Sequence, residues 1–303
     1  MHWLKAWIKA SRLPAQLFIF PSLLLGQGAA YAATGAFSTG RFVALLLFGF
    51  FMHFFIVYGN DYSDYETDRL NTTYTPFTGG SRVLVDGEIS RHHLLWATWL
   101  MAATCIVMGF VFVWLTSLWL TLILVLLGLA LLHAYSFHPI RLSYRGFGEL
   151  LQMLGVGLVL PWLGFLVQSN HTTAMPWVVL AWLLPSQLGM AISTALPDEP
   201  SDRTSLKRTT AVLLGGMRAK WLMFFLYFVS FSGLLLTHAF DVTMGSTVWF
   251  IGILSTLLVA QFILVTQKRT TPGQPALVLL VFVSILLNTL MVIAVTTQFF
   301  LVV

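Results

Sequence analysis

Long apolar runs recur along almost the whole 303-residue chain, and they constrain the fold more than any other feature. A bilayer-spanning helix needs about 20 predominantly apolar residues. The runs show no sustained alternation of apolar and polar residues, so the strands of a membrane barrel are not expected. The sequence therefore predicts an all-α, polytopic membrane protein that forms a single domain over residues 1–303. Nine spans are expected, at 13–34, 42–59, 94–115, 118–135, 150–168, 176–196, 221–238, 247–266 and 276–300.

The composition excludes a soluble enzyme. Hydrophobic residues make up 58% of the chain and charged residues only 9%, whereas about 25% of the residues in soluble domains are charged. Too few charged side chains remain to cover a water-exposed surface, so the expected partner of most of the chain is the lipid bilayer. The net charge of +5 fits the bias of Lys and Arg toward cytoplasmic loops, and a nucleic-acid partner is not expected.

The distribution of basic residues predicts the orientation of the chain. With the N-terminus in the cytoplasm and nine alternating spans, fifteen of the sixteen Lys and Arg residues fall on the cytoplasmic side and only Arg41 falls on the other. This asymmetry is a strong positive-inside signal. We therefore expect a multi-pass protein of the cell inner (cytoplasmic) membrane. Its cytoplasmic loops, at about 60–93, 136–149 and 197–220, are the expected catalytic segments.

Acidic residues gather in two short segments on that same side. Seven of the eleven Asp and Glu residues are Asp61, Asp64, Glu66, Asp68, Asp198, Glu199 and Asp202. Carboxylates next to membrane spans are costly unless they are paired, hydrated or bound to a metal. Their mutual repulsion would be relieved by a divalent cation.

The spacing within the first cluster places its side chains on one helix face. If the second span continues as a helix, Asn60, Asp64 and Asp68 recur every four residues and stack roughly 6 Å apart. Asp61 lies beside that stripe. Such an array of oxygen atoms suits Mg²⁺, which takes one or two carboxylates and completes its octahedron with water and phosphate oxygens.

The second cluster repeats this spacing, because Asp198 and Asp202 are also four residues apart. Lys207 and Arg208 follow closely, so carboxylates for a metal stand beside cations for phosphate oxygens. Either cluster alone could be a solvated loop or a charge that complements a helix dipole. Two matched clusters on one side of the membrane favour a diphosphate site.

Asn60-Asp61-x-x-Asp64-x-x-x-Asp68 after the second span, with Asp198-x-x-x-Asp202 after the sixth, resembles the signature pair of the UbiA superfamily of intramembrane prenyltransferases. The resemblance covers essentially the whole chain and implies a nine-helix UbiA-type bundle. It implies that two Mg²⁺ ions are served by Asn60, Asp61, Asp64, Asp68, Asp198 and Asp202, the five Asp residues being catalytic. Lys207 matches the basic position after the second motif, and Arg12 matches an Arg before the first span.

The connection after the fourth span also resembles the family. Tyr135-Ser136-x-x-Pro139 is similar to its Tyr-Ser/Thr-x-x-Pro segment, which faces the diphosphate. Arg141 and Arg145 are predicted phosphate contacts, with binding to lipid headgroups as the alternative. The expected substrate-binding residues are therefore Asn60, Arg12, Tyr135, Arg141, Arg145, Lys207 and Arg208.

The segment 75–90 contains Gly79-Gly80 and is either a lid over the site or an ordinary surface loop. Its Gly-Gly-Ser-Arg-Val-Leu and Gly-Glu-Ile-Ser sequences, with Tyr-Arg-Gly-Phe-Gly-Glu at 144–149, look most like the branch that prenylates 1,4-dihydroxy-2-naphthoate for menaquinone. The compact first motif differs from that branch, which commonly has extra residues before its last Asp.

The predicted function is Mg²⁺-dependent transfer of a polyprenyl group from an isoprenyl diphosphate to an aromatic acceptor, a quinone precursor such as 1,4-dihydroxy-2-naphthoate. Alternative acceptors are 4-hydroxybenzoate, a chlorin, haem or a glycerol ether. The alternative outside this class is a cation-coupled secondary transporter. Transporter sites tend to lie near the bilayer midplane within inverted repeats, whereas these acids lie at one face of the membrane.

Overall fold

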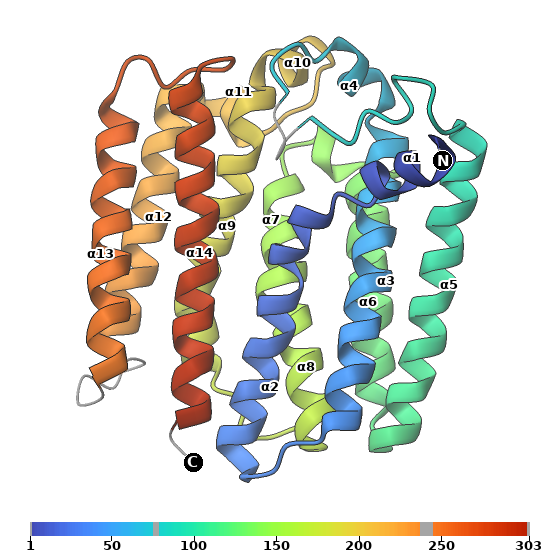
Figure 1. The fold of residues 1–303 in the computed structure, drawn as a ribbon, viewed down its shortest axis with the longest axis vertical. Coiled ribbons are helices and arrows are strands. Elements are labelled where there is room, and N and C mark those ends of the chain that lie inside the picture. Colours follow the sequence, from blue (N-terminus) through green and yellow to red (C-terminus); the bar gives the residue numbers. More distant parts are fainter. Residues whose placement is uncertain (1, 75–78, 237–244, 302–303) are drawn as a thin grey trace.

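The computed structural model describes residues 2–74, 79–236 and 245–301, and every element within those ranges is a helix. The long helices run side by side, with the short ones gathered at one end (Figure 1). The long helices are α2 (Phe20–Thr34), α3 (Thr39–Ser63), α5 (Arg91–Thr116), α6 (Trp119–Ser136), α9 (Trp177–Ala195), α12 (Gly216–Leu236), α13 (Gly245–Thr266) and α14 (Pro275–Leu301). A further long rod comprises α7 (Gly148–Leu154), a π-helical turn (Gly155–Val159) and α8 (Leu160–Ser169).

The short elements lie mostly at one end of the bundle, where the polar connections are. They are α1 (His2–Ala10), α4 (Tyr65–Leu70), α10 (Glu199–Thr204), α11 (Thr210–Leu214) and the 3₁₀ turns η1 (Leu13–Phe18), η2 (Leu142–Tyr144) and η4 (Leu196–Asp198). The predicted all-α bundle is therefore confirmed over the described residues. Eight of their helical segments are long and apolar enough to cross a membrane.

The predicted first span is the one that differs. Residues 13–34 do not form one long helix, because the segment opens as η1 and continues as α2, which has only 15 residues. The predicted count of nine full-length spans is therefore not confirmed. Pro14 and Pro21 lie in the first turns of η1 and α2, and proline cannot donate the backbone hydrogen bond that a continuous helix needs.

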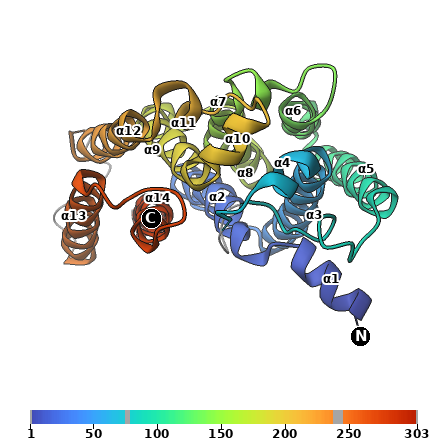
Figure 2. The same ribbon diagram turned by 90° about the horizontal axis from the view of Figure 1, so that it is seen from above.

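Close backbone contact joins α2 to α8 near the middle of the bundle. A Cβ atom on Gly26 would lie 1.9 Å from the Pro161 carbonyl oxygen, and one on Gly164 would lie 2.5 Å from the Leu23 oxygen. Small residues allow membrane helices to approach in this way. Viewed along the bundle, α2 and α8 lie centrally, between α3, α5 and α6 on one side and α12, α13 and α14 on the other (Figure 2).

At the end away from the short helices, one arginine connects three long helices. Arg41 lies in the first turn of α3, and its backbone N–H donates to the N-cap hydroxyl of Ser38. Its guanidinium donates to the Leu115 carbonyl oxygen at 3.0 Å and to the Gln168 carbonyl oxygen at 3.1 Å. Because the last carbonyls of a helix have no partner within it, Arg41 satisfies the C-terminal ends of both α5 and α8.

Candidate active site

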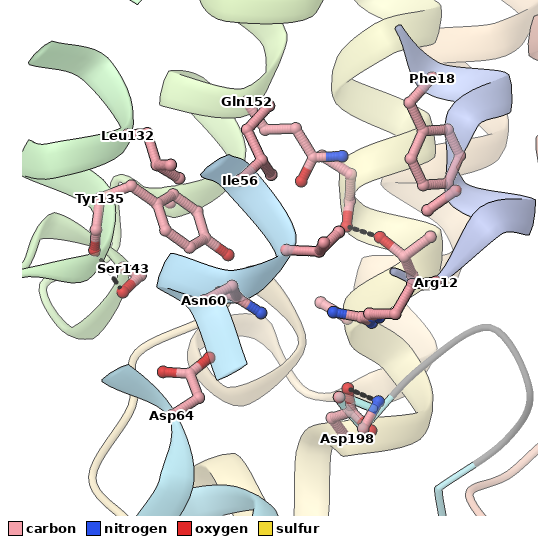
Figure 3. A pocket seen from close by; sticks show the side chains of 18 of the residues that line it. Arg12, Phe18, Ile56, Asn60, Asp64, Leu132, Tyr135, Ser143, Gln152 and Asp198 are labelled. Atoms are coloured by element: carbon pink, nitrogen blue, oxygen red, sulfur yellow. Dashed lines mark hydrogen bonds between the residues drawn. The ribbon is translucent and has the colours of Figure 1, made fainter. Parts of the chain in front are cut away.

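A cavity of about 900 Å³ lies among α3, α6, α7 and α9, and its volume falls within the usual range of small-molecule sites. Its mouth is the end beside α4 and α10, where Asn60, Asp64 and Asp198 are found (Figure 3). The inner wall is apolar and includes Met52, Ile56, Leu132, Val156, Val159 and Leu160. The site therefore combines a polar mouth with an apolar interior.

The first acidic cluster keeps its predicted face although its helix is interrupted. Helix α3 ends at Ser63 and α4 begins at Tyr65, so the second span does not continue unbroken through Asp68. The backbone N–H of Asp64 still donates to the Asn60 oxygen at 2.9 Å, and that of Asp68 donates to the Asp64 oxygen at 2.8 Å. Asn60, Asp64 and Asp68 consequently all line the cavity.

Asp61 is placed differently, because it is buried behind the cavity lining. Its carboxylate accepts hydrogen bonds from the backbone N–H of Ser81, at 3.2 Å, and from the Ser81 hydroxyl. The guanidinium of Arg12, which does line the cavity, lies 3.4 Å from the same carboxylate. In this structure Asp61 holds a loop and an arginine in place.

The second cluster lies opposite the first, where α9 gives way to η4 and α10. Asp198 accepts a hydrogen bond from the Asn71 side-chain amide at 2.8 Å and another from the Gly79 backbone N–H at 3.2 Å. Asp202 is buried, and its Oδ1 atom has no hydrogen-bond partner. Both residues line the cavity, so the two predicted clusters come together at one mouth.

The described parts of the segment 71–82 bridge the clusters. In addition to the bonds to Asp61 and Asp198, the Thr73 hydroxyl donates to the Pro197 oxygen at 2.7 Å. The Arg82 guanidinium donates to the Asp68 carbonyl oxygen at 2.9 Å. Residues 79–81 thus pack directly on the carboxylates. The predicted motion of a lid stays a prediction, and residues 75–78 lie outside the described chain.

Lys207 supplies positive charge between the clusters. Its buried Nζ atom lies 2.7 Å from Asp64 Oδ2 and 3.9 Å from Asp202 Oδ1. Burial alone would lower the pKa of this ammonium group, but the Asp64 and Asp202 carboxylates raise it well above its ordinary value. Lys207 is therefore held as a cation at the point where the two clusters face each other.

Carboxylates still outnumber cations at the mouth. Burial and the neighbouring carboxylates of Asp64 and Asp61 raise the pKa of Asp68 to about 8. Desolvation and like charges both disfavour the ionised form of an acid. A divalent cation would remove this penalty, since it would stabilise the ionised carboxylate.

The oxygen donors at the mouth fit Mg²⁺ bound together with a phosphate. In the part of the chain that the structure describes, no three His, Cys, Asp or Glu side chains are arranged to hold a metal by themselves. Asn60 Oδ1 and Asp202 Oδ1 are nevertheless buried without hydrogen-bond partners. Mg²⁺ needs only one or two carboxylates when water and substrate phosphate complete its octahedron, so such a shared site agrees with the residues present.

The other predicted substrate-binding residues divide into two groups. Tyr135 lines the cavity, and its ring points inward (Figure 3). Three of the four predicted arginines do not line it. Arg141 donates to the Ser63 carbonyl oxygen at 2.6 Å and lies over the Tyr144 ring. Arg145 donates to the Pro139 carbonyl oxygen, and the side chain of Arg208 is exposed. The geometry therefore leaves Arg12 and Lys207 as the predicted cations that reach the cavity.

Several contacts between residues at the mouth were not predicted. Asn71 and Ser81 hold the carboxylates of Asp198 and Asp61. The Tyr144 hydroxyl lies 3.2 Å from Asp64 Oδ1, and Glu149 accepts the Thr210 backbone N–H at 2.6 Å, at the start of α11. In the sequence, only the Gly79-Gly80 turn before Ser81 indicated such a contact, because the other contacts join residues that are distant in sequence.

The fold and the cavity define the class of an intramembrane prenyltransferase. Residues 19–286 match the UbiA prenyltransferase family, and the chain belongs to that family. It is accordingly a multi-pass membrane protein and a prenyltransferase. Comparison with the curated proteins gave no match.

Solved structures of UbiA homologs share this fold. The apo homolog from Aeropyrum pernix K1 has a TM-score of 0.69 at 17% identity, covering 95% of this chain and 98% of that chain. The homolog from Archaeoglobus fulgidus bound to GPP and Mg²⁺ has a TM-score of 0.66 at 18% identity, covering 96% and 99%. The same homolog bound to DMAPP and Mg²⁺ has a TM-score of 0.67 at 19% identity, with the same coverage.

Proposed function

We propose that this protein transfers a polyprenyl group from an isoprenyl diphosphate to an aromatic acceptor in a Mg²⁺-dependent reaction. The observation that carries the proposal is the pairing of two acidic clusters, joined by Lys207, at the mouth of an apolar cavity. A diphosphate head and a hydrocarbon tail match those two environments. The Archaeoglobus fulgidus homolog, bound to GPP or DMAPP with Mg²⁺, supports the same assignment.

The residues at the mouth divide into metal-binding and phosphate-binding groups. The metal set is Asn60, Asp64, Asp68, Asp198 and Asp202, supported from behind by Asp61. Bound Mg²⁺ would neutralise the charge that develops on the leaving diphosphate. Lys207 and Arg12 donate to phosphate oxygens, and the apolar wall that includes Val159 and Leu160 takes the prenyl tail. Burial at the mouth excludes water, which would otherwise capture an allylic cation.

The proposed acceptor is a quinone precursor such as 1,4-dihydroxy-2-naphthoate, in menaquinone biosynthesis. Sequence supports this choice, because residues 79–84, 87–90 and 144–149 resemble that branch of the family. The first of these segments includes Gly79 and Ser81, which donate to Asp198 and Asp61. 4-Hydroxybenzoate, a chlorin, haem and a glycerol ether are the competing acceptors.

We further propose a single membrane-embedded domain in the inner (cytoplasmic) membrane, with the N-terminus and the cavity mouth facing the cytoplasm. The distribution of Lys and Arg supports this orientation, since Arg41 alone among the sixteen falls on the opposite side. Helix α3, whose first turn contains Arg41, begins at the end of the bundle away from α4 and α10 (Figure 1).

The test uses purified protein, Mg²⁺, radiolabelled farnesyl or geranylgeranyl diphosphate and the panel of acceptors. We expect a prenylated product whose formation stops with EDTA and in Asp64→Ala and Asp198→Ala. Glu66→Ala is the matched control, because Glu66 belongs to the same segment but its side chain is 63% exposed and, among the described residues, forms an ion pair only with Arg69. Absence of product with every acceptor, together with ion flux in liposomes, would contradict the proposal and favour a transporter.

A further inference from the structure

Two polar side chains lie deeper in the cavity than the acidic clusters. His53 is 1% exposed and lines the wall formed by α3, seven residues before Asn60. Seven residues make two helical turns, so the two side chains share one face about 10 Å apart. Gln152 lines the wall formed by α7. Its amide reaches into the cavity near Ile56 (Figure 3). Polar groups are therefore present where the wall is otherwise apolar.

The hydrogen bond of His53 defines which ring nitrogen can meet a ligand. Its Nε2 atom lies 2.7 Å from the carbonyl oxygen of Ser11. A carbonyl oxygen can only accept, so Nε2 carries the hydrogen, and in the neutral ring Nδ1 keeps a free lone pair. The ring makes no other hydrogen bond with a described residue, and neither does the amide of Gln152.

Buried polar groups are normally hydrogen-bonded, and a small number of them inside an apolar pocket fixes the orientation of a ligand. Neither side chain belongs to the clusters that would hold Mg²⁺ and diphosphate. The Nδ1 lone pair of His53 is an acceptor, whereas the amide of Gln152 can both donate and accept. Together they complement a molecule that carries hydroxyl or carbonyl oxygens on a flat apolar body.

We propose that His53 and Gln152 form the acceptor-binding subsite, and that it takes a hydroxylated aromatic ring. This inference rests on the proposed function. With the diphosphate at the carboxylates, the reacting prenyl carbon lies just inside the mouth, and the ring must reach it from the level between Asn60 and His53. His53 Nδ1 accepts the hydrogen bond of the ring hydroxyl. That bond increases electron density on the ring carbons that attack.

The experiment measures steady-state kinetics for His53→Leu and Gln152→Leu, varying the acceptor and the donor separately. His133→Leu and Gln187→Leu are matched controls, because neither residue lines the cavity. We expect each cavity variant to raise the acceptor KM about tenfold, as loss of one hydrogen bond predicts, with the donor KM unchanged. The wild type should prefer the hydroxylated acceptor to its O-methyl ether, and the His53 variant should lose that preference.

The possible outcomes distinguish failure of the proposed subsite from failure of the proposed transferase activity. A wild-type acceptor KM in both cavity variants, or an equal rise in donor KM, would overturn the subsite while the transferase activity stands. Lack of product from the wild-type protein would instead refute the proposed function. Because Gln152 makes no hydrogen bond with a described residue, Gln152→Leu should fold normally. That variant keeps the proposal testable even if His53→Leu is unstable.

Discussion

Substitution of Gly80 by alanine tests whether the segment 79–82 positions the carboxylates. Gly80 has a φ of +72°, and a Cβ atom there would lie 2.1 Å from Asp68 Oδ2, about 0.9 Å inside the closest approach of 3.0 Å. A left-handed conformation costs alanine roughly 1–2 kcal/mol. In addition, Asp68 or the loop must move by about 1 Å, a displacement that can reduce an enzyme's rate on the order of 100-fold.

Gly87→Ala provides the control for backbone strain. Gly87 has a similar φ, +69°, but a Cβ atom there would meet no atom within 4 Å. In detergent melts, Gly80→Ala should lose at least as much thermal stability as Gly87→Ala, because both variants carry the backbone strain and only Gly80→Ala adds the contact with Asp68. Only Gly80→Ala should lose prenyl transfer, by about 100-fold, and require more Mg²⁺ for half-maximal rate. Equal activity of the two variants would show that Gly80 does not determine where the Asp68 carboxylate lies.

Three further predictions concern depth, pH and stability. Gly128→Leu should reduce the rate with a long prenyl donor at least tenfold relative to a short one, because its Cβ would lie 3.3 Å from Met52 Cε at the inner wall; equal product ratios would contradict this. In EDTA, melting temperature should fall as pH rises from about 4 to 8, because folded Asp68, with a pKa of about 8, holds its proton more tightly than the unfolded chain. Asp68→Asn should flatten that dependence, and an unchanged slope would refute it. Arg41→Met should lower the melting temperature by several degrees without changing kcat at 25 °C, since it leaves two helix-end carbonyls unpaired; an unchanged melting temperature would refute that role.

Much of the fold could be predicted, because membrane spans are encoded locally by apolar length. The runs at 42–59 and 94–115 became α3 and α5, each extended by a few residues. The first span was less predictable. Its apolar residues continue through Pro14 and Pro21, which lack a backbone hydrogen-bond donor. Composition alone does not indicate where such a segment changes from a 3₁₀ to an α-helix.

The candidate site could be predicted only where its residues recur at helical spacing along the sequence. Spacing by four residues placed Asp64 and Asp68 on one face, and Asp198 and Asp202 on another. The contacts of Ser81 with Asp61 and of Asn71 with Asp198 join distant parts of the chain, and no local pattern marks them. Conversely, a suitable position in the sequence did not place the predicted arginines in the site. Arg141 has a basic charge in a suitable loop, but its guanidinium is used by the Ser63 carbonyl oxygen and the Tyr144 ring.

The glycine contact between α2 and α8 also determines which parts of the protein can move during turnover. With the Pro161 and Leu23 carbonyl oxygens already against Gly26 and Gly164, these central helices have no space to slide or rotate past each other. Substrate exchange must then depend on the peripheral elements at the mouth. Of these, α1 is tied to the segment 79–90 by Lys9, which bonds Asp86 and Glu88 at 2.7 Å each. A hydrocarbon tail that enters from the membrane would therefore pass between elements joined by surface ion pairs, while the central helices α2 and α8 stay fixed.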